Sequence, residues 1–297
     1  MQMSGVGIPH RPEFIAAALL AALASASAPA FAQTDTAATA AGQPGASAVS
    51  DQAVAMAALN PVAAMYSLPL EYNYDHEIGP AEDGHKNYIN VQPVLPFSIG
   101  EDWNLISRTI IPLIDQDDIY PGAGSQSGIG DITQSFFFSP KSPTESGWIW
   151  GAGPVFYLAT ASDDLLGAEK YGAGPTAVFL KQTNGWTFGA LLNQIWSFAG
   201  SGNRSDISST YLQPFLSYTT KSLTTFAVNS ESTYNWEADN DPWTVPINFM
   251  VTQFFKVGQQ RLTFRLGARY WADSPDSGPH GWGGRVTLTF LFPVAKK

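Results

Sequence analysis

Apolar and polar side chains alternate along many stretches of the chain after residue 60. In Arg261–Trp271 the polar set includes Arg261, Arg265 and Arg269, and every second residue between them is apolar or aromatic. Side chains of a β-strand point alternately to its two faces, so this segment predicts a strand with three arginines on one face. Residues 282–292 repeat the pattern, with Arg285 on the polar face. We therefore expect strands that each have one apolar and one polar face.

The same alternation, interrupted by Gly, Pro, Asn and Asp, divides the rest of the chain into about twelve segments. Bacterial single-chain barrels have an even number of strands, which twelve satisfies; ten or fourteen would satisfy it too. The expected strands lie near 67–75, 87–97, 102–114, 128–139, 147–160, 170–181, 185–198, 208–220, 223–237, 243–256, 260–273 and 281–292.

The segments between the expected strands alternate in length. Tight turns are expected near 98–100, 183–185, 221–222 and 257–259, with a longer one at 140–147. Longer, acidic loops are expected at 76–85, 116–126, 162–169, 200–205, 238–241 and 274–280. This asymmetry is typical of outer-membrane barrels, whose longer loops lie outside the cell. It predicts an all-β, transmembrane, antiparallel up-and-down β-barrel with both termini in the periplasm.

The composition supports a membrane barrel over a water-soluble protein. Charged residues make up 13% of the chain, about half the usual share of roughly 25%. The mean hydropathy is −0.05, as expected when one strand face meets lipid and the other a polar lumen. Residues 182–203 carry no charge and could span as a helix, but their Asn-Gly pair and alternating aromatics favour strands. Tryptophans and tyrosines near the expected strand ends predict two aromatic girdles; ordinary core packing is the alternative.

The first 60 residues differ from the rest. Residues 1–32 have the charged, apolar and small-residue order of a secretory signal peptide, with cleavage expected after Ala32 and an uncleaved anchor as the alternative. Residues 33–60 are rich in Ala, Thr, Ser and Gly, which predicts a flexible periplasmic tail with a short helix near 52–59. This tail has little large apolar surface to support a plug-like role. The barrel is expected over 61–297.

Motifs in the first expected strands resemble a known family. They are Asn60-Pro61-Val62-Ala63, Ser67-Leu68-Pro69-Leu70, residues 90–97, residues 103–113 and Gly128-Ile129-Gly130-Asp131. They are similar to the bacterial outer-membrane transporter family of the phenol meta-degradation type, often mislabelled neuromedin U. The resemblance covers the chain from about Asn60 onward. It implies an outer-membrane barrel with a role in uptake, and it implies no particular substrate.

Charged and polar residues on the inward face are the candidate functional residues. A lipid-facing arginine would cost about 2–4 kcal/mol near the membrane midplane, so Arg265 and Arg269 are expected to face the lumen. Inward charges can line a pore, or they can pair with one another and fill the lumen. The candidates are Glu71, Asn90, Gln92, Arg108, Asp131, Glu231, Arg265, Arg269 and Arg285.

Cation binding, hydrolysis and metal binding receive less support from the sequence than a pore does. The acidic residues assigned to the outer loops, Asp75 among them, could attract cations, or they could form a solvated surface. After the signal peptide, His76, His85 and His280 are all expected in outer loops, where none could act as the base of a membrane-level serine hydrolase. A zinc site from these histidines has only generic spacing. We therefore expect no enzyme activity, catalytic residue, metal or cofactor.

The sequence also limits the partners. The chain has no cysteine, so no disulfide can form, and its net charge of −10 argues against nucleic-acid binding. We expect outer-membrane lipids around the barrel and a small-molecule solute in the lumen; the sequence does not indicate an oligomeric state. The favoured function is an outer-membrane channel for passive uptake of small molecules, hydrophobic or aromatic ones included. The alternatives are a structural or adhesive barrel with a filled lumen and acidic partner-binding loops, and a membrane-level hydrolase.

Overall fold

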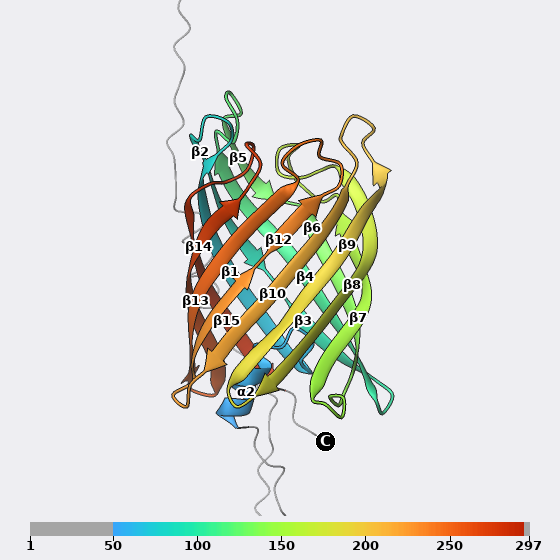
Figure 1. Ribbon diagram of the computed structural model, residues 1–297, viewed down its shortest axis with the longest axis vertical. Coiled ribbons are helices and arrows are strands. Elements are labelled where there is room, and N and C mark those ends of the chain that lie inside the picture. The colour runs from blue at the N-terminus through green and yellow to red at the C-terminus, as the bar shows by residue number, and fades with distance from the viewer. Residues whose placement is uncertain (1–49, 294–297) are drawn as a thin grey trace, which may run out of the picture. The chain divides into compact units, whose positions relative to one another are not determined.

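The computed structural model describes residues 50–293, and within these residues nearly all regular structure is β. Among them, no helix is long and apolar enough to cross a membrane. Figure 1 shows the helix α2 (Asp51–Ala57) and the strands. The strands are β1 (Met65–Ile78), β2 (Gly84–Val91), β3 (Val94–Ile99), β4 (Trp103–Asp117), β5 (Ser125–Ile129), β6 (Ile132–Pro140), β7 (Trp148–Leu158), β8 (Lys170–Thr183), β9 (Trp186–Gly200), β10 (Ser208–Thr219), β11 (Thr224–Ser230), β12 (Ser232–Asn235), β13 (Trp243–Val257), β14 (Gln260–Asp273) and β15 (Trp282–Pro293).

These segments form a closed antiparallel barrel of twelve wall strands. Three wall strands are each interrupted once, so that β2 with β3, β5 with β6, and β11 with β12 count as one strand apiece. Each wall strand pairs with the next along the chain, and β15 pairs with β1 to close the barrel. Closure leaves no unpaired edge in the membrane. The predicted fold class and the count of twelve are confirmed.

The three interruptions fall at inward-facing polar residues. The first lies at Gln92 and Pro93, where proline has no backbone N–H to donate to a neighbouring strand. The second lies at Gly130 and Asp131, and the third at Glu231. The alternation of side chains in the sequence did not indicate these breaks. Three of the predicted lumen candidates therefore occupy irregular backbone.

Turns and loops separate to opposite ends of the barrel (Figure 1). The five turns after β3, β6, β8, β10 and β13 lie at one end, together with the start of β1 and the end of β15. The six longer loops lie at the other end, as the sequence predicts. The predicted loop at 76–85 is too long: β1 extends to Ile78 and β2 begins at Gly84, so the loop between them is only 79–83. His76 and His85 consequently lie on strand ends, outside that loop.

The outer face of the barrel is apolar. Leu266 and Phe249 are 54% and 51% exposed, whereas Arg269 on the opposite face is 1% exposed. Aromatic pairs lie near both ends: Trp103 with Trp150 beside the turns, and Tyr270 with Trp282 beside the longer loops. A closed barrel with an apolar outer band and aromatic rings at both rims is the structure expected to span a bilayer.

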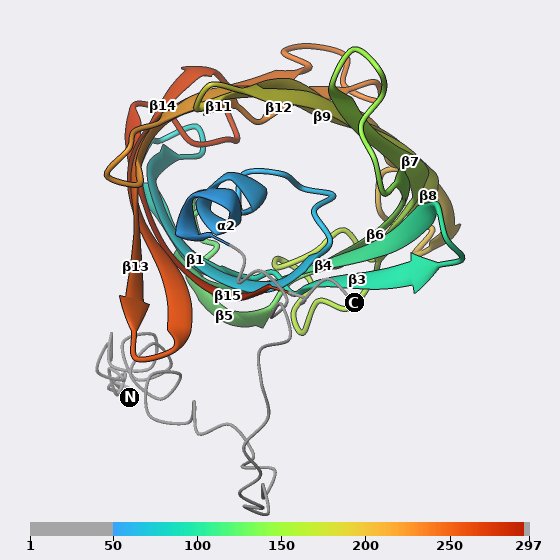
Figure 2. The same ribbon diagram turned by 90° about the horizontal axis from the view of Figure 1, so that it is seen from below.

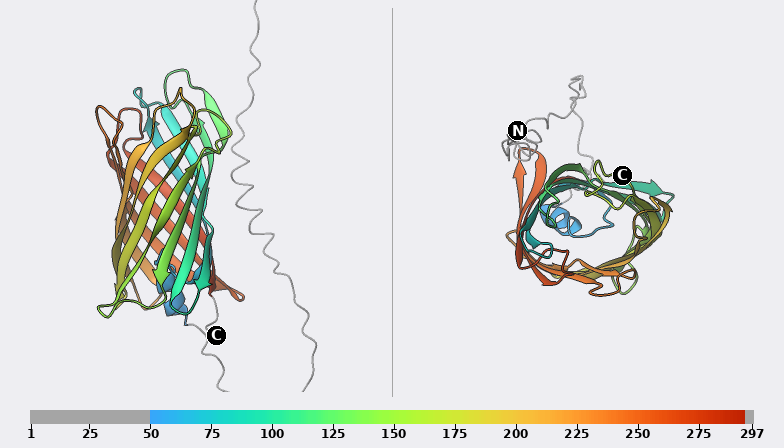
Figure 3. Two further views of the ribbon diagram at one scale, coloured as in Figure 1. Left: turned by 90° about the vertical axis from the view of Figure 1, so that its right-hand side faces the viewer. Right: turned by 90° about the horizontal axis from the view of Figure 1, so that it is seen from above.

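Residues 50–64, here called the N-terminal segment, lie inside the barrel at the turn end (Figures 2 and 3). Ser50 caps helix α2 by accepting a hydrogen bond from the Ala53 backbone N–H at 3.2 Å. Val54 packs in an apolar cluster with Phe254 and Leu291 of the wall. The part of the predicted flexible tail that the structure describes, residues 50–60, is thus packed in place. The predicted signal peptide and residues 33–49 lie outside the described residues.

Candidate functional site

The barrel interior contains a cavity of about 330 Å³. It extends from the N-terminal segment, where Ala55 and Leu59 line it, to Arg285 and Glu231 on the wall. Its lining combines polar residues with apolar ones such as Phe215. Seven of the nine candidate residues contribute to the lining: Glu71, Asn90, Gln92, Arg108, Glu231, Arg265 and Arg285. The structure therefore brings most of the predicted inward-facing residues to one cavity.

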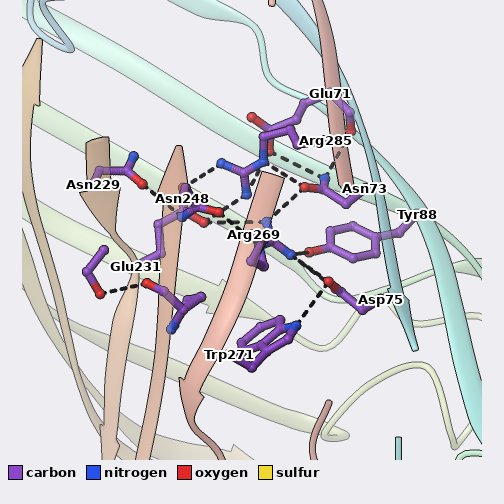
Figure 4. A network of polar contacts seen from close by, with 12 residues as sticks. Glu71, Asn73, Asp75, Tyr88, Asn229, Glu231, Asn248, Arg269, Trp271 and Arg285 are labelled. Carbon is purple, nitrogen blue, oxygen red and sulfur yellow. Dashed lines mark hydrogen bonds and ion pairs between the residues drawn. The ribbon is translucent and has the colours of Figure 1, made fainter. Parts of the chain in front are cut away.

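Arg269 stands apart from the cavity and is held in a dense polar network (Figure 4). Its Nη1 donates to both carboxylate oxygens of Asp75, at 3.1 and 3.0 Å, and to the Tyr88 hydroxyl at 2.9 Å. Its Nε donates to Asn248 at 3.0 Å, and its Nη2 donates to Asn73 at 2.9 Å. Its hydrogen-bonding groups are thus nearly all used inside the protein, which makes Arg269 a structural residue.

Arg285 extends the same network and joins it to the cavity (Figure 4). It forms a two-point ion pair with Glu231, in which Nη1 and Nη2 lie 2.7 and 2.8 Å from the two carboxylate oxygens. Its Nε donates to Asn73 at 2.8 Å, so Asn73 accepts hydrogen bonds from both arginines. Glu71 lies 3.6 Å from Arg285. Such buried charges are tolerable because each has partners of opposite charge or complementary hydrogen-bonding capacity.

The network joins six neighbouring wall strands. Its members come from the β11–β12 strand, β13, β14, β15, β1 and β2, half of the circumference. Glu231 occupies the break between β11 and β12, and Arg285 reaches it across β14 and β13. This part of the lumen corresponds to the filled, paired interior that the sequence left as one alternative.

Arg108 and Arg265 differ from the two network arginines. Arg108 donates one hydrogen bond, from Nη2 to Gln92 at 2.9 Å. Arg265 also donates one, from Nε to the Thr252 hydroxyl at 3.1 Å. Among the described residues, no carboxylate lies within 4.0 Å of either guanidinium. Both side chains line the cavity, so part of each guanidinium's hydrogen-bonding capacity faces open space.

Asp131 does not line this cavity. Its carboxylate accepts backbone N–H groups of Thr160 and Ala161, each at 3.0 Å, and of Ala168 at 2.6 Å. These residues belong to the loop between β7 and β8. Because a carboxylate that accepts several backbone N–H groups is strongly held, Asp131 fastens this loop to the barrel rim.

Sequence reasoning missed several contributors to the interior. Asp75 was assigned to the solvated acidic loops, yet it is only 3% exposed and pairs with Arg269. It lies in phase with Glu71 and Asn73 on β1, which is a signal that could have placed it inside. Tyr88 and the N-terminal segment were missed as well. Which partner an inward side chain meets depends on strands that are far apart in the sequence.

The histidines and acidic loops show no assembled chemical site. His76 contacts Glu77 at 3.2 Å and packs against the ring of Tyr74. Within residues 50–293, no group of three or more His, Asp or Glu side chains is arranged to hold a metal ion. Lys170 and Asp206 form an ion pair of 2.8 Å beneath the loops, and the hydrogen bond from Lys170 lowers the pKa of Asp206. These charges thus hold the loops in place.

The closed twelve-strand wall and the apolar outer face define an outer-membrane-type β-barrel. Among solved structures, the chain resembles an outer membrane channel from Pseudomonas putida F1, with a TM-score of 0.62 and 15% identity over 77% of this chain and 96% of that one. The NanC porin gives a TM-score of 0.48 at 9% identity, covering 77% and 100% of the two chains. Outer membrane phospholipase A from Escherichia coli gives 0.45 at 10% identity, covering 77% and 93%.

The likeness to the Pseudomonas putida channel supports the barrel fold. No protein-family model matches the sequence, and no curated protein matches it.

Proposed function

We propose that the chain is an outer-membrane channel for the passive uptake of small molecules, hydrophobic or aromatic ones included, with both termini in the periplasm. The observation that carries the proposal is the cavity of about 330 Å³ inside a closed barrel. This volume falls within the range of small-molecule sites, roughly 300–1,000 Å³. A barrel built only for stability would fill this volume with side chains, as the smallest barrels do.

The lining of the cavity supports both parts of the proposal. The guanidiniums of Arg108 and Arg265 offer free donors to a solute, while Phe215, Leu223 and Phe254 offer apolar contact. The family resemblance of the sequence, which implies uptake, agrees with this composition. Transport through the cavity needs a path past the N-terminal segment at the turn end.

The filled-lumen barrel is the second candidate, and the Arg269–Arg285 network favours it. That network uses Asp75, Glu231 and Asn73 to satisfy both arginines. The network fills only part of the interior, and the cavity remains next to it, lined in part by Glu231 and Arg285 of the network itself. No observation in the described residues favours the hydrolase.

A planar-bilayer experiment tests the proposal. The mature chain and a variant lacking residues 33–59 are refolded, and their single-channel conductances are compared. We expect conductance from the full chain and a larger conductance from the shortened one, because Ala55 and residues 57–59 line the turn end of the cavity. A liposome-swelling assay with neutral solutes of increasing size then measures the permeable range.

The control for the deletion is a chain lacking residues 33–49 only, which keeps helix α2 and its cap. Its conductance should equal that of the full chain. Closed traces from the full chain and from both deletions, with correct folding verified by heat-dependent gel migration, would contradict a channel and favour the filled-lumen barrel.

A further inference from the structure

The cavity carries an unbalanced positive charge. Its charged lining consists of three arginines, Arg108, Arg265 and Arg285, against two glutamates, Glu71 and Glu231. This leaves one positive charge in excess, although the whole chain has a net charge of −10. Charges in a space walled by protein are screened less than charges on the surface. An anion of one unit charge would neutralise the excess.

The excess resides on Arg108 and Arg265 because the other charges are already paired. Glu231 is bound at two points by Arg285. Glu71 is directed toward Arg285, at 3.6 Å, and toward Asn73, whose Nδ2 lies 3.5 Å away. Each remaining guanidinium uses a single donor on a neutral side chain. A guanidinium has five N–H donors in a planar fork that matches the geometry of a carboxylate.

A second observation marks the place beside Arg265. Thr287 is 3% exposed, and its hydroxyl is one of two buried side-chain polar atoms in the described residues without a hydrogen-bond partner. Thr287 lies directly opposite Arg265 in the pairing of β15 with β14, and it also lines the cavity. A buried hydroxyl without a partner costs free energy, so this position is suited to an incoming acceptor.

From these observations we infer that the cavity binds an organic monocarboxylate, with its carboxylate at Arg265 and Thr287. Arg108 supplies the second attracting charge, and Gln92 at the strand break holds Arg108. The apolar body of the ligand packs against Phe215, Leu223 and Phe254. Glu71, opposite Thr287 on β1, disfavours ligands of higher negative charge. The inference rests on the proposed function and names the class of solute that it carries.

Binding of benzoate to the refolded mature chain, measured by calorimetry, tests the inference. Benzamide serves as the neutral probe of the same shape, and benzylamine as the cationic one. We expect benzoate to bind at least about tenfold more tightly than benzamide, since a hydrogen bond between two charged groups is stronger than one to a neutral amide. Benzylamine should bind more weakly than benzamide.

Four variants locate the site. Arg265→Gln should weaken benzoate binding about tenfold and leave benzamide binding unchanged. Arg265→Lys should retain part of the preference because it keeps the charge, and Thr287→Val should weaken benzoate binding by a smaller factor. Lys221→Met removes the same charge from an exposed turn residue at the end of the barrel where β10 meets β11, and should change nothing.

Equal affinities for benzoate and benzamide, or an Arg265→Gln variant that binds benzoate like the parent, would overturn the inference. The bilayer traces separate this result from failure of the channel. If the barrel conducts but shows no preference for the anion, the proposed function stands and the inference is wrong. If the barrel binds benzoate through Arg265 but never conducts, the binding site stands and the channel function is wrong.

Discussion

Asp75 of β1 and Arg269 of β14 form a buried ion pair in which both carboxylate oxygens lie within 3.1 Å of Nη1. The two residues are 194 positions apart in the chain, and β15 lies between their strands. Their side chains are 5% and 2% exposed. The pair therefore ties the first wall strand to the eleventh, beside the place where the barrel closes.

Removing the carboxylate should destabilise the barrel strongly. Breaking a buried pair by losing one partner costs about 3–5 kcal/mol, because the other charge stays buried without compensation. We expect Asp75→Asn to lower the free energy of unfolding in lipid vesicles toward this extent, as measured in urea. Asp83→Asn, at an exposed loop position, is the matched control and should unfold like the parent. Equal stability of the two variants would show that Asp75 carries no such role.

The attachment of helix α2 should respond to acid. Asp51 pairs with Lys256 at 2.7 Å and Arg261 at 3.3 Å, and the hydrogen bond from Lys256 holds the pKa of Asp51 below its ordinary value against the effect of desolvation. A lowered acid pKa means that the contact is complete above the ordinary value of about 3.9 and is lost as the pH falls through the folded value.

Conductance measured against pH checks this contact. Open events of larger conductance should become more frequent at an acid pH well below the ordinary value of about 3.9 than at about pH 7, where Asp51 is ionised. Asp51→Asn should show the frequent openings already at neutral pH and lose the pH dependence. Identical gating of parent and variant at both pH values would mean that these ion pairs do not hold the segment.

The loop between β7 and β8 should loosen when Asp131 loses its charge. In Asp131→Asn an amide NH2 group, which cannot accept a hydrogen bond, replaces one carboxylate oxygen. Either the backbone N–H of residue 168 or those of residues 160 and 161 then lose their acceptor. A hydrogen bond to a charged group is worth about 1.5–3 kcal/mol, so local opening should increase at least about tenfold. Amide hydrogen exchange over residues 159–169 measures this local opening. Asp164→Asn, the control, keeps the hydrogen bonds of Asp131, so its loop should exchange at the rate of the parent protein.

The membrane-facing side can be checked with two exposed outer positions, one in the middle of a wall strand and one at the end of another. Leu266 is 54% exposed on the outer face, beside the inward Arg265. Leu266→Arg should destabilise the barrel by about 2–4 kcal/mol in vesicles if the position lies near the bilayer midplane. Val257→Arg, at the exposed end of β13, should cost only about 0–1 kcal/mol. Similar small costs at both positions would contradict a lipid-facing wall.

The alternation of side chains was sufficient to predict the strands and the faces of most candidates. Arg265, Arg269 and Arg285 follow the period of two, and all three point inward in the structure. Asp75 follows the same period from Glu71, but its place next to an acidic loop concealed it. Gln92, Asp131 and Glu231 lie at strand breaks, where irregular backbone changes what a side chain can reach.

The sequence alone predicted the barrel class, a wall of about twelve strands and the separation of turns from loops, because each depends on patterns within a few residues. Only the tertiary structure decided which inward charges are paired, that Asp131 fastens a loop, and that residues 50–64 occupy the lumen. Those outcomes depend on side chains from strands far apart in the chain meeting across a closed wall. Closure of the barrel fixes the distances between these side chains, and the pattern of neighbouring residues in the sequence does not predict them.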